Sequence, residues 1–322
     1  MKKAVVRMKI ADVIIKMESV FPLQPVTEES KKQQVEERFN NFFLKGDGGG
    51  DIQIEVKIVK NLPVVCGAKV VFVTYHFQDG SENWRLLQKG NTYYYKSPLK
   101  DKRQVMVVNK DFDRVTAYLL PKNMSGVFDE ASCKFLKEHK GMTWQPSDLI
   151  YDFLQVLLIN YFTKNRMGIF THAIGVKDIG GRGLLFAGKS GAGKSTTARI
   201  WHKNTKAMVL NDDRIIVRKK DGQFRMYGSP WHGEFSDYLA SRIDDAALKR
   251  LFFIHHSKEN TARQISAHEA FLSLYPALFP PFWDKGCLKN AADFSHELVN
   301  KVSCYSLGFV NNEKVIDFVR KI

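Results

Sequence analysis

Residues 188–195 read Gly-Lys-Ser-Gly-Ala-Gly-Lys-Ser, which matches the pattern G-x-x-x-x-G-K-[ST]. This pattern needs a strand that leads into a glycine-rich turn and a helix that starts at once behind it. The apolar residues 184–187 precede the turn, and the helix-compatible residues 196–202 follow it. Glycines let successive backbone N–H groups turn toward one anion, and the helix N-terminus adds partial positive charge. The segment therefore predicts a phosphate-binding strand–loop–helix unit that binds a nucleoside triphosphate; the alternative is an ordinary glycine-rich turn.

The loop defines the residues that we expect to contact ATP and Mg²⁺. Lys194 would reach the β- and γ-phosphates, and the hydroxyl of Ser195 would be a ligand of Mg²⁺. The expected nucleotide-binding residues are Gly188, Lys189, Ser190, Gly191, Ala192, Gly193, Lys194, Ser195 and Thr196.

Two adjacent carboxylates follow the next apolar segment. Phosphoryl transfer needs a metal anchor, a group that positions or deprotonates the acceptor, and positive charge for the transition state. Asp212 and Asp213 come directly after residues 207–210, which we expect to form a strand. Adjacent residues at a strand end can point apart, so that one carboxylate faces the metal ion and the other the acceptor hydroxyl. A pair of turn aspartates is the alternative interpretation. Arg214 and Lys189 are candidate charge stabilisers, although each can equally be a solvated surface residue.

The order of elements around the loop predicts the fold class. In doubly wound nucleotide-binding folds, helices separate parallel strands on both sides of the loop. Here turn residues indicate hairpins before and after the loop, so the sheet is expected to be mixed. Expected strands are residues 171–179, 184–187, 207–210, 214–219, 223–227, 251–256 and 302–309. A capping box at residues 266–269 predicts a helix that ends before Pro280-Pro281, and a short helix is expected at the C-terminus.

The first part of the chain has a different pattern. Residues 4–17 suggest one strand, residues 27–45 a helix, and the strict alternation of residues 52–58 a strand. Further short strands are expected at residues 64–77, 84–87, 91–95, 104–108 and 114–120. A helix over residues 149–162 forms the expected junction between domains. We therefore expect an α/β protein, α+β overall, with a smaller β-rich domain at residues 1–144 and a phosphate-loop domain of mixed-sheet type at 145–322.

Net charge, cysteine spacing and the length of apolar runs restrict the partners and the location that we expect for the protein. The 322-residue chain carries a net charge of +15, but no block of five or six basic residues occurs, which favours a solvated basic surface around an anionic substrate over nucleic-acid binding. The four cysteines lie far apart without a C-x-x-C pair, so a reducing cytoplasm is the expected location. Charged residues interrupt the apolar runs, so no membrane span is expected. The sequence does not determine the oligomeric state, and a homo-oligomer is one of the alternatives.

One family carries a similar series of motifs. The order of His172, then residues 188–196 as G-x-S-G-x-G-K-S-T, then residues 210–214 as Leu-Asn-Asp-Asp-Arg resembles the HPr kinase/phosphorylase C-terminal domain. That domain shares its nucleotide core with the phosphoenolpyruvate carboxykinases. Residues 227–234, Tyr-Gly-Ser-Pro-Trp-His-Gly-Glu, are similar to the segment that follows the paired aspartates in HPr-kinase-related proteins. The resemblance covers residues 147–322.

The resemblance implies roles for individual residues. It makes Asp212 the base toward a substrate serine hydroxyl, and it assigns Mg²⁺ to Asp213 and Ser195. It places His172 beside the phosphate site, with a packed core histidine as the alternative. From its own position in Trp-His-Gly, His232 can approach the acceptor or a phosphate, or it can pack beside the tryptophan.

Two departures bear on the substrate. The family's basic Pro-Gly-Arg type loop does not occur between Ser266 and Ile322, and residues 1–125 do not resemble the family's N-terminal domain. Relatives with this shorter layout include kinases that phosphorylate a serine of a ribosomally made precursor peptide. The leading hypothesis is an ATP- and Mg²⁺-dependent kinase that acts on a hydroxyl of a peptide, a protein or a small molecule, most plausibly a serine. The alternatives are a carboxykinase-type enzyme and a non-catalytic nucleotide-binding switch.

Overall fold

The computed structural model describes residues 3–24, 39, 41–75, 80–97, 104–122, 130–150, 153–231, 233 and 244–322. The chain divides into two compact units, Met1–Tyr161 and Phe162–Ile322. Each unit contains a sheet with both parallel and antiparallel neighbours, so the fold is mixed α/β as the sequence predicts.

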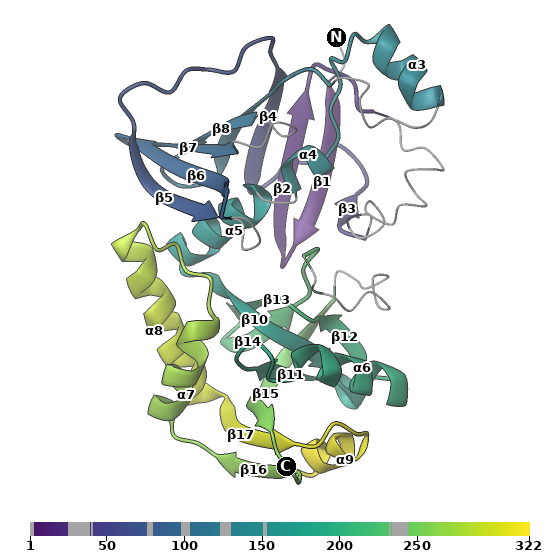
Figure 1. Ribbon diagram of the computed structural model, residues 1–322, viewed down its shortest axis with the longest axis vertical. Helices are drawn as coiled ribbons and strands as arrows, with labels where there is room; N and C mark the ends of the chain where they lie inside the picture. Colours follow the sequence, from purple (N-terminus) through teal and green to yellow (C-terminus); the bar gives the residue numbers. More distant parts are fainter. Residues whose placement is uncertain are drawn as a thin grey trace. The chain divides into compact units, whose positions relative to one another are not determined.

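The described part of the first unit contains a nine-stranded sheet in the order β3-β1-β2-β4-β9-β8-β7-β6-β5 (Figure 1). The pairs β2–β4 and β4–β9 are parallel, and the other neighbours are antiparallel. The strands are β1 (Ala4–Ile10), β2 (Val13–Ser19), β3 (Phe43–Leu44), β4 (Ile52–Ile58), β5 (Lys69–Tyr75), β6 (Glu82–Lys89), β7 (Thr92–Ser97), β8 (Gln104–Asn109) and β9 (Arg114–Leu119).

The sheet of the first unit has one buried and one open face. In β4, Ile52 and Ile54 are fully buried, whereas Gln53 and Glu55, which alternate with them, are exposed, which confirms the predicted alternation. The first unit also contains helices α3 (Glu130–Glu138) and α4 (Ser147–Ile150), and α5 (Phe153–Lys164) runs across the division between the units. The ring of Phe153 lies 5.3 Å from that of the fully buried Tyr95, so α5 begins against the buried face.

The prediction of one strand over residues 4–17 is wrong, because the chain reverses there. β1 and β2 form an antiparallel hairpin in which Ile10 pairs with Val13. The two residues between them, Ala11 and Asp12, have φ angles of 46° and 61°. This is the left-handed backbone of a tight two-residue hairpin turn. Such turns usually contain glycine or asparagine, and the first position here is an alanine, so the turn signal was missing.

The sheet of the second unit is partly closed on itself. Its order is β11-β10-β13-β14-β15-β17-β16, and β11 also pairs in parallel with β15, which joins five strands into a closed circuit of pairings. β12 continues the edge of β10 beyond β13. The strands are β10 (Gly168–Lys177), β11 (Arg182–Ala187), β12 (Met208–Asn211), β13 (Arg214–Lys220), β14 (Gln223–Tyr227), β15 (Asp245–His256), β16 (Thr261–Gln264) and β17 (Ser303–Phe309).

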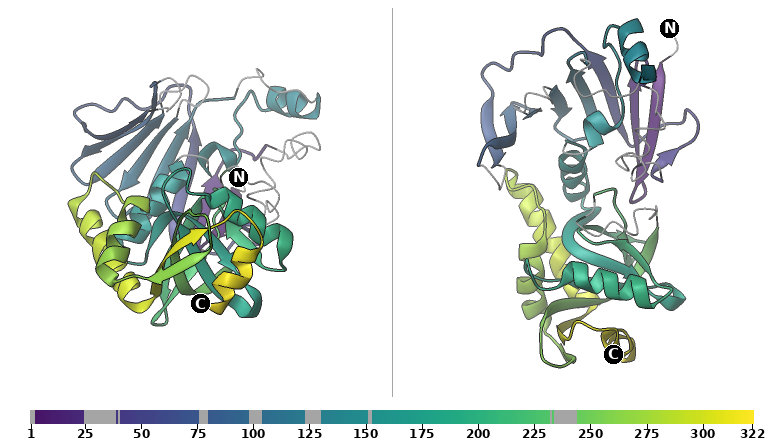
Figure 2. Two further views of the ribbon diagram at one scale, coloured as in Figure 1. Left: turned by 60° about the horizontal axis from the view of Figure 1, so that its bottom comes forward. Right: turned by 45° about the vertical axis from the view of Figure 1, so that its right-hand side comes forward.

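Helices cover this sheet on two sides, each over a separate apolar cluster. One cluster joins the sheet to α7 (Ala267–Leu274) and α8 (Lys285–Lys301). The other joins it to α6 (Lys194–Asn204) and α9 (Lys314–Lys321). Figure 1 and the left view of Figure 2 show the two helix pairs on opposite sides of the strands.

The structure confirms the predicted strands around the loop to within three residues at each end, except that β15 begins at Asp245, six residues before its predicted start at residue 251. The helix expected over residues 27–45 lies mostly outside the described residues, and its last part is strand β3. The sequence analysis missed β16, α3 and the 17-residue helix α8. The N-cap of α8 is Asp284, whose side chain accepts a hydrogen bond from the Cys287 N–H at 3.0 Å. This acidic cap comes three residues after Pro281, and the prediction ended the preceding helix before Pro280-Pro281.

Candidate functional site

The predicted phosphate loop connects β11 to α6 through two glycines in left-handed conformation. Gly191 has φ 77° and Gly193, the N-cap of α6, has φ 96°. Residues with a side chain rarely adopt these angles, so the glycines allow the sharp turn between the strand and the helix. Space imposes a second constraint, because a Cβ atom on Gly193 would lie 2.7 Å from Cζ of Phe309. The glycine therefore lets the start of α6 lie directly on β17.

The lysine of the loop folds back over it. Nζ of Lys194 donates to the carbonyl oxygens of Gly188 at 2.9 Å and Lys189 at 3.1 Å. The amide of Ala192 donates to the Lys189 carbonyl at 3.1 Å, which closes the turn. These bonds hold the ammonium group of Lys194 against the loop at the N-terminus of α6. An ammonium group and a helix N-terminus together attract an anion.

Asn211, the last residue of β12, determines how the two aspartates leave the strand. Its side-chain oxygen accepts hydrogen bonds from the amides of Asp213 and Arg214, both at 2.8 Å. Its side-chain nitrogen donates to the carbonyls of Ser229 and Trp231, both at 2.9 Å. All four contacts are made by a side chain that is 1% exposed. The carboxamide therefore fixes the turn in which Asp212 and Asp213 lie.

Asp212 and Asp213 have different surroundings. Oδ1 of the buried Asp212 accepts a hydrogen bond from the Gly233 amide at 2.7 Å. Oδ1 of Asp213 lies 2.6 Å from Nδ1 of His172 and 2.7 Å from Nη1 of Arg214. His172 comes from β10 and Arg214 from the start of β13, and their side chains meet where these strands pair. One carboxylate thus contacts a backbone amide, and the other contacts two basic side chains.

Charge sets the protonation of Asp213. Burial alone would raise the pKa of this carboxyl group, but the hydrogen bond from His172 and the charges of Arg214, His172 and Lys194 outweigh burial and hold the pKa below its ordinary value. Asp213 is therefore ionised at neutral pH. An ionised carboxylate is the form that binds a divalent cation.

The same charges connect Asp213 to the phosphate loop. The pKa of Lys194 lies below its ordinary value because the amine is buried, and the negative charge of Asp213 opposes this shift. Each group thus affects the ionisation of the other, although 19 residues of sequence separate them. The structure brings the predicted residues Lys194, Asp213 and His172 into one electrostatic cluster.

Arg214 is held between this cluster and an aromatic ring. Its guanidinium carbon lies 4.1 Å from the centre of the Phe279 ring, and the ring of His172 lies edge-on to Phe279 at 6.2 Å. Burial lowers the pKa of Arg214, while the charges of Asp213 and Asp212 act in the opposite direction. Phe279 is itself fixed to β10, because its amide donates to the Phe170 carbonyl at 3.1 Å. The aromatic ring therefore restricts where this guanidinium can move.

Other predicted site residues have simpler positions. Ser195 and Thr196 lie half-buried in the first turn of α6, whereas Lys189 and Ser190 are exposed on the loop. His232 lies outside the described residues, so its predicted role stays a prediction. Within the described ranges, no three His, Cys, Asp or Glu side chains gather as ligands of one metal ion.

Sequence reasoning missed three residues of this site. Asn211 was quoted within the Asn-Asp-Asp motif without a role, although an Asn before two polar residues is a common sign of a side-chain turn. Phe279 and His256 are 65 and 42 residues beyond Arg214 in the sequence, and no local pattern connects them to the motifs. Nε2 of His256 lies 2.9 Å from the carbonyl oxygen of Gly191 in the loop.

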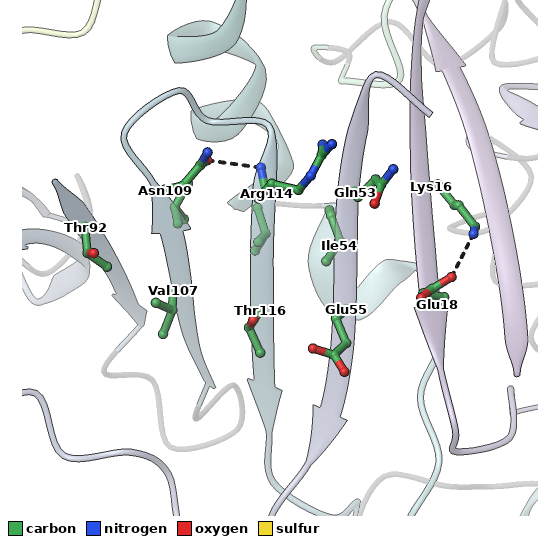
Figure 3. A pocket seen from close by; sticks show the side chains of 12 residues that line it. Lys16, Glu18, Gln53, Ile54, Glu55, Thr92, Val107, Asn109, Arg114 and Thr116 are labelled. Carbon is green, nitrogen blue, oxygen red and sulfur yellow. Dashed lines mark hydrogen bonds and ion pairs between the residues drawn. The ribbon is translucent and has the colours of Figure 1, made fainter. Parts of the chain in front are cut away.

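The first unit contains a separate groove on the open face of its sheet (Figure 3). Five polar residues form one row across neighbouring strands: Lys16, Gln53, Arg114, Asn109 and Thr92. A second row contains the carboxylates Glu18 and Glu55. None of the lining residues belongs to the predicted catalytic or nucleotide-binding set. The groove presents donors and acceptors side by side, which suits a polar, extended ligand.

Comparison with known proteins leaves the chain without a family assignment. No protein-family model matches it, and no curated protein matches it. Among solved structures, it is similar to the Hpr(Ser) kinase/phosphatase from Coxiella burnetii, with 14% sequence identity and a TM-score of 0.23. That similarity covers 40% of this chain and 90% of the other chain. Among the helices described here, none is long and apolar enough to cross a membrane. A function for the site must therefore be argued from the residues of this chain.

Proposed function

We propose that this protein is an ATP- and Mg²⁺-dependent kinase that transfers the γ-phosphoryl group to an alcohol, with a serine of a peptide or protein as the acceptor. The observation that carries the proposal is that β11, which leads into the phosphate loop, and β12, which leads into Asp212 and Asp213, both end against residues 173–175 of β10. The opposite charges of Lys194 and Asp213 act on each other there. Phosphoryl transfer needs a phosphate-binding cation and a metal-binding carboxylate next to each other. A non-catalytic glycine-rich turn has no need of the second group.

The loop supports nucleotide binding in particular. Its left-handed glycines and the N-terminus of α6 provide backbone N–H groups and positive potential for phosphate oxygens. Residues 188–196 would cradle the phosphates, with Lys194 against the β- and γ-phosphates. Arg214, held against Phe279, would add positive charge beside the negative charge that develops on the phosphoryl group during transfer.

The residues also fit Mg²⁺. This ion keeps several waters and uses one or two protein oxygens together with substrate phosphates, so it does not require a cage of carboxylates. The hydroxyl of Ser195 and the ionised carboxylate of Asp213 are the oxygens that would hold it. The bound ion would neutralise charge on the transferring phosphate.

Asp212 is the residue we assign to the acceptor. It follows the same strand as Asp213, and its Oδ1 accepts a hydrogen bond from the amide of Gly233. We assign to its carboxylate the orientation of the acceptor hydroxyl and the acceptance of its proton. His172 would act indirectly, by holding the carboxylate of Asp213, which it contacts directly.

The N-terminal region, residues 1–144, is proposed to recognise the acceptor. All motifs that handle phosphate lie in the second unit, whereas the first unit carries the polar groove on its open sheet face. An extended peptide segment presents alternating donors and acceptors that such a surface can bind.

Calorimetric titration with MgATP tests the assignment of the loop. We expect Lys194→Ala to raise the Kd at least about tenfold, because a charged hydrogen bond to phosphate contributes about 1.5–3 kcal/mol. Ser195→Ala should weaken MgATP binding more than binding of ATP without the metal. Lys203→Ala, an exposed lysine in the last turn of the same helix, is the control. Wild-type affinity in Lys194→Ala would rule out the phosphate loop.

A further inference from the structure

The exposed tip of the phosphate loop, residues 189–191, touches a strand other than the one that leads into it. Lys189, Ser190 and Gly191 are all exposed. The carbonyl oxygen of Gly191 lies 2.9 Å from Nε2 of His256, the last residue of β15. A carbonyl oxygen only accepts hydrogen bonds, so Nε2 carries the proton and donates it. The contact thus fixes the histidine tautomer as well as the loop.

His256 is held in place by its own neighbour. β15 and β17 pair in parallel with His256 opposite Phe309, and the two rings stack with centres 5.8 Å apart. Phe309 is buried and also lies directly beneath Gly193 at the start of α6. The rings of the exposed His256 and the buried Phe309 therefore stack on each other beside the loop.

The contact lies at the glycine-rich turn of the loop. Gly191 and Gly193 both lack a side chain and adopt positive φ angles, which give the backbone more freedom there than other residues would. In a planar trans peptide, the carbonyl of Gly191 and the amide of Ala192 point in opposite directions. The amide of Ala192 donates to the Lys189 carbonyl at 3.1 Å, so the contacts to His256 and Lys189 together hold both sides of this peptide and with it the turn of the loop.

We propose that His256 is a positioning residue that holds the phosphate loop in its nucleotide-binding conformation by donating its Nε2 proton to Gly191. This inference rests on the proposed nucleotide function of the loop. It adds a residue outside the loop motif, from a strand that the motif does not include. His256 itself contacts the loop and not the reacting atoms, so its effect is on nucleotide affinity.

Calorimetry with MgATP on the full-length protein tests this with three variants. His256→Leu removes the donor, and we expect its Kd to rise about three- to tenfold, the range for one neutral hydrogen bond. His256→Gln keeps an N–H donor at a similar reach and should bind within about twofold of the wild type. His255→Leu is the matched control, because successive side chains on a strand point to opposite faces. It should bind as the wild type does.

Hydrogen exchange gives a second readout that a loss of general stability would not reproduce. Amides of residues 188–195 should exchange faster in His256→Leu than in His256→Gln, while amides of β15 and β17 keep their protection. Wild-type affinity in His256→Leu overturns the inference and leaves the proposed function intact, provided that Lys194→Ala binds weakly. Equal weakness of the Gln and Leu variants also overturns it, because ring packing would then be the cause. Absence of MgATP binding in the wild type contradicts both proposals.

Discussion

At the scale of single residues, one turn gives two adjacent aspartates different surroundings. The carboxamide of Asn211 binds the amides of Asp213 and Arg214 and so sets the direction of each following side chain. Asp213 is consequently paired with His172 and Arg214, while Asp212 accepts from the Gly233 amide. We therefore expect the two carboxylates to respond differently to the same substitution.

Asp213→Asn should change the metal dependence of the reaction. The variant loses the ionised oxygen that we assign to Mg²⁺, so the Mg²⁺ concentration for half-maximal transfer should rise about tenfold or more. The measurement is a Mg²⁺ titration of phosphoryl transfer at fixed ATP. Asp221→Asn, in an exposed turn, serves as the control. Identical titration curves for Asp213→Asn and the wild type would show that Asp213 does not hold the metal.

The sequence predicts residues of this site well only where they share a local pattern. The loop and the Asp-Asp pair are each a short run of consecutive residues. Each can be predicted from the sequence once the single strand that precedes it is identified. Phe279 and His256 reach the site from distant segments through the pairing of strands. Their contacts depend on tertiary packing, which no short pattern contains.

At the scale of elements, prediction succeeded where hydrophobic period and turn residues agreed. β4 alternates strictly and β13–β14 turn at Asp-Gly, and both were predicted within a residue of their bounds. The turn of β1–β2 uses Ala11 and Asp12, which are poor turn signals, so that hairpin was predicted as one strand. Helix α8 was missed although its buried residues recur at intervals of three and four, as Cys287, Ala291, Phe294, Ser295, Leu298 and Val299, so its helical pattern was present in the sequence.

The C-terminal helix α9 is fixed by a buried ion pair. The side chain of Asp178 is 0% exposed, and Arg320 donates to its two oxygens at 2.7 and 3.1 Å. Burial alone would raise the pKa of Asp178, but hydrogen bonds from Arg320 and the Ile179 amide, with the charges of Arg320 and Arg182, hold it below its ordinary value. The ionised carboxylate thus connects α9 to the end of β10.

Asp178→Asn should lower the free energy of unfolding at pH 7 by about 1–3 kcal/mol, because Arg320 loses its counter-charge. A group whose pKa is lowered by folding stabilises fully above its ordinary pKa, about 4, and loses this contribution as pH falls through the lower folded value. The difference between variant and wild type should therefore shrink below about pH 4. Urea denaturation at several pH values measures it, with Asp221→Asn, in an exposed turn, as the control. A difference that does not depend on pH would contradict the ionic account.

At the scale of the whole molecule, the chain separates chemistry from the surface that we assign to recognition. The phosphate loop, the paired aspartates and His172 all belong to the unit Phe162–Ile322. The groove belongs to the unit Met1–Tyr161, and Arg114 stands in the middle of its polar row (Figure 3). Substitutions in the groove should therefore affect the acceptor and not the nucleotide.

Arg114→Ala in the full-length chain should raise the KM for the acceptor about three- to tenfold and leave the Kd of MgATP unchanged. The reason is that Arg114 lies in the polar row of the groove, in the unit Met1–Tyr161, whereas the loop belongs to the unit Phe162–Ile322. Steady-state kinetics at saturating MgATP, together with calorimetry, separates the two effects. Lys110→Ala, a basic residue on the turn between β8 and β9, is the control. An unchanged acceptor KM would show that the groove does not bind the acceptor.

Phosphoryl transfer by Asp212→Asn tests the central claim most directly. The protein is incubated with γ-labelled ATP, Mg²⁺ and a library of serine-containing peptides, and the labelled residue is identified by mass spectrometry. The kinase account predicts label on a serine hydroxyl with the wild type. It predicts a rate at least about a hundredfold lower with Asp212→Asn, although that variant still binds MgATP with the wild-type Kd. Transfer by Asp212→Asn at the wild-type rate, or nucleotide binding by the wild type without any transfer to a hydroxyl, would contradict it.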